Sequence, residues 1–462
     1  MTMAFKEMPD RSFKPLPPTV TPPARPLSLV QTLRAARRNV LEIIPALAYR
    51  QPMLSGRLGA RWHMVQDPVA LRRIFLDEVD NYPKSEVMLR MLRPAVGDSL
   101  FTSNGESWRW QRRAVAPVFA QRNVTALAPV MTATAERAHR RLSGSGGKAE
   151  MVAEMLSATF DVICEVALSG REHFDADAYA DAILRYFETA GKASVLDFLQ
   201  MPDWMPRPGA LLGRGAVRTM HAMVSRAIEA RRGKAGGGVD DLLDHMLKAE
   251  DPETGRRMTP TDLIHNMQFF IVAGHETTAL ALSWSLLLLA WHPEAQTRAR
   301  EEARAALGGH AAAGAEHLDA TPYVKQVIEE AMRLYPPVGL LARNALQPDI
   351  LAGREVLPKD TIFIPTYALH RHEMWWDRPN EFNPDNFSPE ATEGRDRFLY
   401  LPFGAGPRVC VGANFAMMQA HIILTTLLAR LRFAPGPGRA PVPTMSMTVR
   451  PDNGVWLTIE RI

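Results

Sequence analysis

The chain has 462 residues, of which 46% are hydrophobic and 23% charged, a composition that excludes a disordered or fibrous protein. Its 54 basic and 50 acidic residues leave a net charge of +4, too small an excess to indicate a nucleic-acid-binding surface. The sequence has two cysteines, Cys164 and Cys410, so no framework of disulfides holds the fold and a reducing compartment is expected.

The first 26 residues are rich in proline and contain no continuous apolar run. Proline removes a backbone donor and disfavours helix in the residue before it, so residues 1–26 are predicted to form an extended segment. Such a segment is neither a signal peptide nor a membrane anchor. We therefore expect a soluble cytoplasmic protein in which residues 27–462 form one large domain.

Helical spacing of apolar residues dominates the rest of the chain. It predicts helices over 123–142, 151–168, 178–189, 216–232, 261–291, 322–334 and 414–431. Short runs of β-branched and aromatic residues, bounded by turn residues, predict strands at 61–65, 361–365 and 455–459. The expected fold class is mainly α with small β-sheets.

An early basic segment, 108–113, reads Trp-Arg-Trp-Gln-Arg-Arg. Trp108 and Arg112 share a helix face, and a guanidinium beside an indole suits a carboxylate ligand, although a solvated basic face is the default for such a segment. Later in the chain, Glu330 and Arg333 lie three apart on one helical face. Such a pair is usually a surface ion pair of little energetic value.

The helix predicted over 261–291 contains the sequence Ala-Gly-His-Glu-Thr-Thr at 273–278. A glycine followed by an acid and an alcohol is expected to interrupt this apolar helix and to open a pocket for a small ligand or water. Glu276 and Thr277 can then relay protons. The zinc motif HExxH is excluded because Ala279 stands where its second histidine is needed. A solvated polar turn in a core helix is the alternative.

Cys410 lies in a loop that reads Phe-Gly-Ala-Gly-Pro-Arg-Val-Cys-Val-Gly at 403–412. Glycines and a proline make a tight turn, and amide groups at the start of the following helix favour a thiolate. Val409 excludes the dinucleotide motif GxGxxG, and no nearby cysteine or histidine supports zinc. A cysteine nucleophile, an axial ligand of haem iron and an ordinary core cysteine are the alternatives.

Taken together and in order, these segments resemble the cytochrome P-450 family of haem-thiolate monooxygenases, over nearly the whole chain after residue 26. The cysteine loop fits the family pattern F-x-x-G-x-R-x-C-x-G at Phe403, Gly406, Arg408, Cys410 and Gly412. The resemblance implies that Cys410 is the axial ligand of the haem iron and that Arg408 contacts a haem propionate. It also implies a single large fold with haem between the oxygen-binding helix and the cysteine loop.

The other segments fit the same family. The resemblance assigns Ala273 and Gly274 to the oxygen-binding groove and proton delivery to Glu276 and Thr277. It implies that Trp108, Arg112 and Arg343 hold propionates, and that Glu330 and Arg333 form a structural pair. One departure is Asn386, which stands where the family usually has an arginine that joins this pair. An amide can hydrogen-bond the pair without supplying charge.

By this resemblance, the protein binds haem b and inserts one oxygen atom from O2 into a hydrophobic substrate. The expected reaction is hydroxylation, and the expected substrate is a fatty acid, hydrocarbon, terpenoid or aromatic compound. It resembles soluble bacterial members, so NAD(P)H would supply electrons indirectly, through a ferredoxin and a ferredoxin reductase. The candidate pocket segments are 84–100 and 194–208, and the candidate substrate contacts are Phe270, Val338, Leu340, Leu341 and Val455.

Two other functions are compatible with a haem-binding cysteine. One is a peroxide-driven peroxygenase or an isomerase on the same fold, and the other is a non-enzymatic haem sensor or carrier. Neither needs a proton relay, so the pair Glu276 and Thr277 counts against both.

Overall fold

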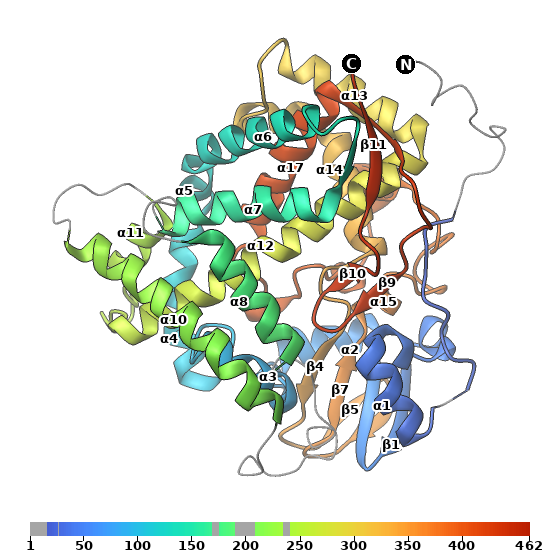
Figure 1. Ribbon diagram of the computed structural model, residues 1–462. Coiled ribbons are helices and arrows are strands. Elements are labelled where there is room, and N and C mark those ends of the chain that lie inside the picture. The colour runs from blue at the N-terminus through green and yellow to red at the C-terminus, as the bar shows by residue number, and fades with distance from the viewer. Residues whose placement is uncertain (1–15, 26, 169–174, 190–207, 234–240) are drawn as a thin grey trace.

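The computed structural model describes residues 16–25, 27–168, 175–189, 208–233 and 241–462. The helices are α1 (Leu29–Arg38), α2 (Pro68–Arg72), α3 (Glu86–Val96), α4 (Gly105–Val115), α5 (Gln121–Ala126), α6 (Ala128–Ser143), α7 (Met151–Leu168), α8 (Ala176–Thr189), α10 (Pro208–Gly233), α11 (Leu242–Lys248), α12 (Pro260–Trp291), α13 (Pro293–Leu307), α14 (Pro322–Leu334), α15 (Thr366–Leu369), α16 (Pro389–Thr392) and α17 (Ala413–Arg430). The strands are β1 (Met53–Leu58), β2 (Ala60–Val65), β3 (Lys148–Glu150), β4 (Leu341–Asn344), β5 (Asp349–Leu351), β6 (Arg354–Val356), β7 (Thr361–Ile364), β8 (Leu431–Pro435), β9 (Pro443–Met445), β10 (Val449–Pro451) and β11 (Trp456–Arg461). The expected mainly α class is confirmed (Figure 1).

Helix α12 runs through the middle of the helical body and packs against α7, α14 and α17 (Figure 1). Its start is fixed by a capping box, in which the side chains of Thr259 and Asp262 each accept from the other residue's backbone N–H. The helix is continuous, so the predicted interruption at 273–278 is wrong. The hydroxyl of Thr277 donates to the carbonyl of Ala273 within the same helix, and packing against α7 supports this turn from outside.

Within the described residues, α12 is the one helix long and apolar enough to cross a membrane, and 78% of its most apolar window is buried inside the protein. A helix that is apolar on all sides needs such burial. Its composition therefore reflects a place in the core.

The strands form small sheets that join distant parts of the chain. The largest has the order β1-β2-β7-β4, with β2 and β7 parallel and the outer pairs antiparallel. A second sheet has the order β3-β11-β8. Strands β9 and β10 form a separate antiparallel pair near the C-terminus. Figure 1 shows this pair close to α15 and apart from the helices α8 and α10.

Most predicted elements are confirmed, and α7 and α14 have the predicted bounds. The single helix predicted over 123–142 is wrong, because α5 ends at Ala126 and α6 begins at Ala128. Pro129 lies in the first turn of α6, where its missing N–H costs nothing, but it cannot continue a helix from α5.

The described part of the proline-rich segment, residues 16–25, packs against the domain. Val20 is buried, and the carbonyl of Pro18 accepts a hydrogen bond of 3.0 Å from the hydroxyl of Tyr335. The carbonyl of Pro23 accepts from the backbone N–H of Ala46 at 3.1 Å. These contacts bring residues 23–25 to the wall of the cavity described below.

Glu330 and Arg333 of α14 form a fully buried ion pair. Two guanidinium nitrogens of Arg333 donate to the two carboxylate oxygens at 2.7 and 2.8 Å. The guanidinium also donates to the carbonyls of His370, Pro379 and Glu381. The amide of Asn386 donates to both oxygens of Glu330, at 3.2 and 3.3 Å, so the prediction that an amide can join this pair without charge is confirmed.

Candidate functional site

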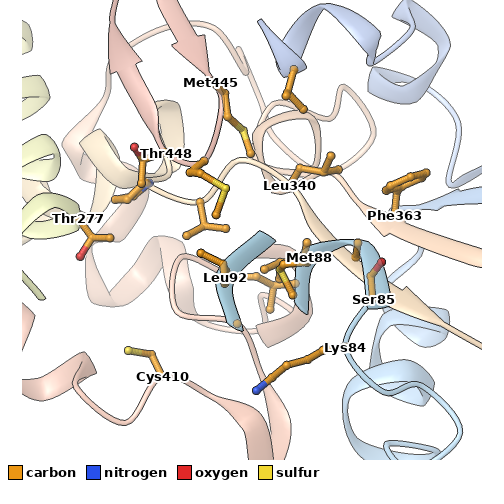
Figure 2. Close-up of a pocket in the computed structure, with 18 of the residues that line it drawn as sticks. Lys84, Ser85, Met88, Leu92, Thr277, Leu340, Phe363, Cys410, Met445 and Thr448 are labelled. Atoms are coloured by element: carbon orange, nitrogen blue, oxygen red, sulfur yellow. The ribbon is translucent and has the colours of Figure 1, made fainter. Parts of the chain in front are cut away.

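A cavity of about 850 Å³ lies between the N-terminal segment, the β1–β2 hairpin, α3, α12, the loop that carries Cys410 and the β9–β10 turn. Its wall is mainly apolar. In Figure 2, Cys410 and Lys84 lie along the lower edge, Met445 and Thr448 along the upper edge, and Met88 and Leu92 of α3 between them. A cavity with an apolar wall and a few polar groups is the usual form of a small-molecule site.

The loop that carries Cys410 is held in one conformation by close backbone packing. The N–H of Cys410 donates to the carbonyl of Phe403 at 2.9 Å. Gly406 has φ +67°, and a Cβ there would lie 1.8 Å from the carbonyl oxygen of Phe75, so only glycine fits. Gly412 ends the loop as the N-cap of α17. This arrangement exposes the side chain of Cys410 toward the cavity.

Desolvation and the amides of the loop act on the pKa of Cys410 in opposite directions. Burial raises the pKa of the thiol, and this outweighs the opposing effects of the Gly412 amide and of Arg112. Desolvation disfavours the charged form of any acid. A bound metal ion would favour the thiolate of Cys410.

Four cations cluster beside this loop: Lys84, Arg112, Arg343 and Arg408. Burial lowers the pKa of each, to about 10 for Arg343, and mutual repulsion contributes for Lys84 and Arg343. Their polar contacts are uncharged: Lys84 donates to the carbonyls of Leu100 and Phe101, Arg112 to the carbonyl of Val409, Arg343 to that of Ala342, and Arg408 to the amide oxygen of Asn104. Within the described residues, no carboxylate is hydrogen-bonded to any of the four.

This cluster fits a dianionic ligand, because buried and partly buried cations that make no hydrogen bond to an acid are costly unless a ligand supplies the charge. The Nε of Arg408 is buried without a hydrogen-bond partner, and its guanidinium lies 4.5 Å from the ring centre of Trp108. The two propionates of a haem would complement four such cations. Cys410 lines the same cavity and would supply a thiolate ligand to the haem iron. The residues present therefore fit haem.

The acid and the alcohol of α12 are both engaged in this structure. Thr277 donates its hydroxyl hydrogen to the carbonyl of Ala273 at 2.8 Å. One carboxylate oxygen of Glu276 accepts from the hydroxyl of Thr448 and, at 2.5 Å, from the Nε of Arg450. Burial alone would raise the pKa of Glu276, but the hydrogen bond and charge of Arg450, with Thr448 and His275, hold it below its ordinary value. Glu276 is therefore ionised at neutral pH.

The structure brings most of the predicted site residues to this one cavity. Its lining includes Trp108, Arg112, Phe270, Ala273, Gly274, Glu276, Thr277, Val338, Leu340, Leu341, Arg343, Phe403, Arg408, Cys410 and Gly412. Gly406 lies behind the loop, against Phe75. Val455 is outside the lining, buried where its backbone pairs with Glu150 and Met151. The predicted pocket segment 194–208 lies, up to residue 207, outside the described residues.

No sequence motif assigns a specific role to Lys84, Thr448 or Arg450. Lys84 falls in the predicted pocket segment 84–100, but its cation faces the cluster only because of how β4 and the Cys410 loop pack around it. Thr448 and Arg450 lie more than 170 residues beyond Glu276. No local pattern marks a contact of that range.

Comparison with known proteins agrees with this site. A model of the cytochrome P450 family matches residues 22–458. The chain is 31% identical to cytochrome P450 4A24 and to taurochenodeoxycholic 6 alpha-hydroxylase, both of Sus scrofa, over 403 residues, 82% of this chain and 79% of each relative. It is 29% identical to cyclooctatin synthase of Streptomyces melanosporofaciens over 442 residues, 94% of each chain.

The fold is also that of a solved structure. The crystal structure of the cytochrome P450DA heme domain superposes with a TM-score of 0.79 and 23% sequence identity, and the match covers 97% of this chain and 99% of that one. The family match extends over nearly the whole chain and includes the loop that carries Cys410. The protein therefore belongs to the cytochrome P450 family and is a haem-dependent monooxygenase that uses O2.

Proposed function

We propose that this protein is a monooxygenase that uses haem b, held by Cys410, to insert one oxygen atom from O2 into a hydrophobic organic substrate, with hydroxylation as its main reaction. The observation that carries the proposal is the placement of Cys410 in the same apolar cavity as Thr277 and four cations, of which Lys84 and Arg343 are buried and Arg112 and Arg408 partly buried. When bound, haem supplies the iron that binds and activates O2.

The residues of the chain orient the haem and deliver protons. Lys84, Arg112, Arg343 and Arg408 bind the propionates and fix the orientation of the group. Gly274 and Ala273 leave space on the cavity side of α12. The hydroxyl of Thr277 would pass on a proton at this point of the helix, and the ionised Glu276 would take up a proton from solvent and replace the one that Thr277 has lost. The apolar wall excludes water from the substrate.

The proposed substrate is an apolar molecule of lipid or terpenoid size. Two relatives have names that state such chemistry, taurochenodeoxycholic 6 alpha-hydroxylase and cyclooctatin synthase. The cavity supports this proposal, since Phe270, Val338, Leu340 and Leu341 line it together with Met88 and Leu92. The volume of about 850 Å³ is shared between the haem, at the residues around Cys410, and the substrate.

Electrons are proposed to come from NAD(P)H through a ferredoxin reductase and a ferredoxin, in the cytoplasm. This part rests on the resemblance to soluble bacterial members; among the relatives, cyclooctatin synthase of Streptomyces melanosporofaciens aligns with 94% of the chain. The apolar character of α12 does not argue for a membrane protein, because the helix is mostly buried.

The proposal is tested first by the visible spectrum of the purified protein, reduced with dithionite and exposed to carbon monoxide. A strongly red-shifted Soret band is expected from thiolate ligation of haem. A panel of palmitic acid, taurochenodeoxycholate and a cyclic diterpene is then screened for a change of spin state and for oxidised product. Haem that binds without the shifted band contradicts the thiolate assignment. Turnover with hydrogen peroxide alone, at the rate seen with NADH and redox proteins, favours a peroxygenase.

Thr277→Ala is expected to uncouple the reaction. Without the hydroxyl, protons are delivered with the wrong geometry, so product formation falls by about 10–100-fold while NADH oxidation continues and hydrogen peroxide rises. The measurement is the ratio of product to NADH consumed. Thr277→Ser keeps the hydroxyl and is the matched control, expected to remain close to wild type. Unchanged coupling in the alanine variant would exclude Thr277 from the relay.

A further inference from the structure

A serine, a histidine and an aspartate are joined by hydrogen bonds at the edge of the β1-β2-β7-β4 sheet. The hydroxyl oxygen of Ser55 lies 2.8 Å from the Nδ1 of His63, and the Nε2 of His63 lies 3.0 Å from a carboxylate oxygen of Asp360. Ser55 is on β1, His63 is on β2, and Asp360 directly precedes β7. An alcohol, a base and an acid in this order are the groups that turn a serine into a nucleophile.

Strand pairing brings the serine and the histidine together. Ser55 and His63 are directly opposite in the antiparallel register of β1 and β2, so their side chains lie on the same face of the sheet. His63 is 2% exposed, whereas Ser55 is exposed. The base is therefore shielded from water, while the hydroxyl that it contacts remains accessible.

Asp360 determines which nitrogen of His63 carries the proton. Its side chain is 5% exposed. The Oδ2 that faces His63 also accepts the backbone N–H of Leu357 at 2.8 Å and lies 3.3 Å from the Nε of Arg61. A carboxylate among donors is an acceptor only, so the Nε2 of His63 is protonated and its Nδ1 can accept the proton of Ser55.

The backbone beside Asp360 is held in an unusual conformation. Lys359 has φ +73° although it is not a glycine, and such a conformation persists only where the surroundings fix it. The N–H of Lys359 donates to the carbonyl of Ala345 at 2.8 Å, and the carbonyl of Asp360 accepts from the N–H of Ala345 at 3.0 Å. These two bonds fix the place from which the carboxylate reaches His63.

The edge of the sheet supplies hydrogen-bond donors next to the serine. β1 is the outer strand of its sheet, and the N–H groups of an edge strand point alternately toward the partner strand and away from it. Of the N–H groups of Ser55 and Gly56, one therefore points outward, where it can bind the oxygen of a carbonyl under attack. Gly56 lies against Trp62, since a Cβ there would be 2.4 Å from the indole ring.

The surroundings of Ser55 are apolar. Ser55 lies in the wall of the large cavity, and its neighbours Leu54 and Leu58 on β1 line the same wall. Leu47, which is 48% exposed and also lines the cavity, belongs to the short helical turn 46–49 that packs against β1. An exposed serine among leucine side chains fits an ester with an apolar acyl group.

We propose that Ser55, His63 and Asp360 form a second catalytic site, which hydrolyses carboxylic esters that have an apolar acyl group. The Oγ of Ser55 bonds to the acyl carbon while the Nδ1 of His63 takes the hydroxyl proton. The bond between the acyl carbon and the ester oxygen then breaks, and the leaving alcohol takes that proton from His63. Asp360 is a positioning residue, because it acts through His63.

Water completes the reaction. It attacks the acyl carbon of the acylated serine, and the Nδ1 of His63 takes one of its protons. The carboxylic acid then departs as that proton returns to the oxygen of Ser55. Ester and water thus become acid and alcohol with no change of oxidation state. The site is independent of the proposed monooxygenase function.

The test uses the haem-loaded protein without any reductant, so that oxygenation does not contribute. One probe is an alkyl fluorophosphonate, from which an activated serine displaces fluoride, and the other is p-nitrophenyl octanoate. We expect the phosphonate on Ser55, located by peptide mass spectrometry, and hydrolysis of the ester that falls at least about 10-fold in Ser55→Ala. No phosphonate on Ser55, or equal hydrolysis by Ser55→Ala and wild type, overturns the proposal.

Ser143 provides the matched control. Its hydroxyl lies 3.2 Å from the Nε2 of His139, but among the residues that the structure describes no carboxylate is hydrogen-bonded to this histidine. Ser143 is therefore expected to remain unlabelled, and Ser143→Ala is expected to hydrolyse the ester at the wild-type rate. Labelling of Ser143 as fast as Ser55 would show that a histidine neighbour alone accounts for the reactivity, which contradicts a role for Asp360.

Asp360→Asn separates positioning from a purely structural link between strands. The amide keeps the size of the side chain but can donate an N–H to His63, which favours the wrong tautomer. The maximal rate of labelling at Ser55 is expected to fall at least about 100-fold, while the fluorophosphonate concentration at half-maximal rate stays unchanged. Wild-type labelling kinetics in Asp360→Asn overturn the proposal. If this variant does not fold, labelling of Ser55 against Ser143 in the unaltered chain decides.

Discussion

Replacement of Cys410 by alanine is expected to remove the red-shifted Soret band of the reduced, carbon monoxide-treated protein and to lower substrate oxidation at least about 100-fold. The side chain faces the cavity, and its loop is held by the Phe403 carbonyl and by the contact of Gly406 with Phe75. No other described cysteine lies at the cavity. Absorption spectra and product yield measure the two effects.

The matched control is Cys164→Ala. Cys164 is the other cysteine of the chain and is fully buried in α7. Its loss is expected to cost about 1 kcal/mol of stability and to leave the spectrum unchanged. A Cys410→Ala protein that keeps the shifted band would show that another group ligates the iron. That result would remove the basis of the proposed chemistry.

Arg333→Ala is expected to reduce the free energy of unfolding by about 3–5 kcal/mol, the usual result of removing one member of a buried ion pair. Glu330 would remain buried without a hydrogen-bonded cation, since Asn386 supplies only an amide. Three backbone carbonyls, those of His370, Pro379 and Glu381, would also lose their donor. Denaturant unfolding of the haem-loaded protein, followed by circular dichroism, measures the change.

The control for this prediction is Arg378→Ala. Arg378 and Glu381 have the same i,i+3 spacing and a separation of 3.1 Å, but their side chains are 61% and 47% exposed. Exposed pairs contribute little, so a change below about 0.5 kcal/mol is expected. If Arg333→Ala does not fold, Glu330→Gln tests the same pair with a smaller expected loss of stability. A change below about 1 kcal/mol in both buried variants contradicts a structural role.

The sequence predicts an element best where interactions between residues near in sequence set its bounds. The bounds of α7 and α14 follow from apolar spacing and from Pro322 at the start of α14. The break between α5 and α6 was missed although Pro129 signals it, because apolar spacing continues across the break. The continuity of α12 was missed for the opposite reason. Its glycine and polar residues are unfavourable locally, and packing against α7 outweighs that preference.

For the site, motif spacing identified the residues that line the cavity but not how they interact. The ion pair of Glu330 with Arg333 looked exposed from its spacing alone, and burial of α14 changes its energetics completely. The thiolate expected from the amides of the cysteine loop is opposed by desolvation, which no local pattern reports. The binding of Glu276 by Arg450 depends on where a C-terminal hairpin packs, so it could be found only in three dimensions.

The cluster of Lys84, Arg112, Arg343 and Arg408 also affects how this protein is made in a cell. Four neighbouring cations, two of them buried and two partly buried, weaken the folded chain through desolvation and repulsion until a dianionic group neutralises them. A ligand that binds only the folded state adds stability in proportion to the logarithm of its concentration over its dissociation constant. The yield of intact protein during biosynthesis is therefore expected to follow the supply of haem, and chains made without it are the ones exposed to proteases.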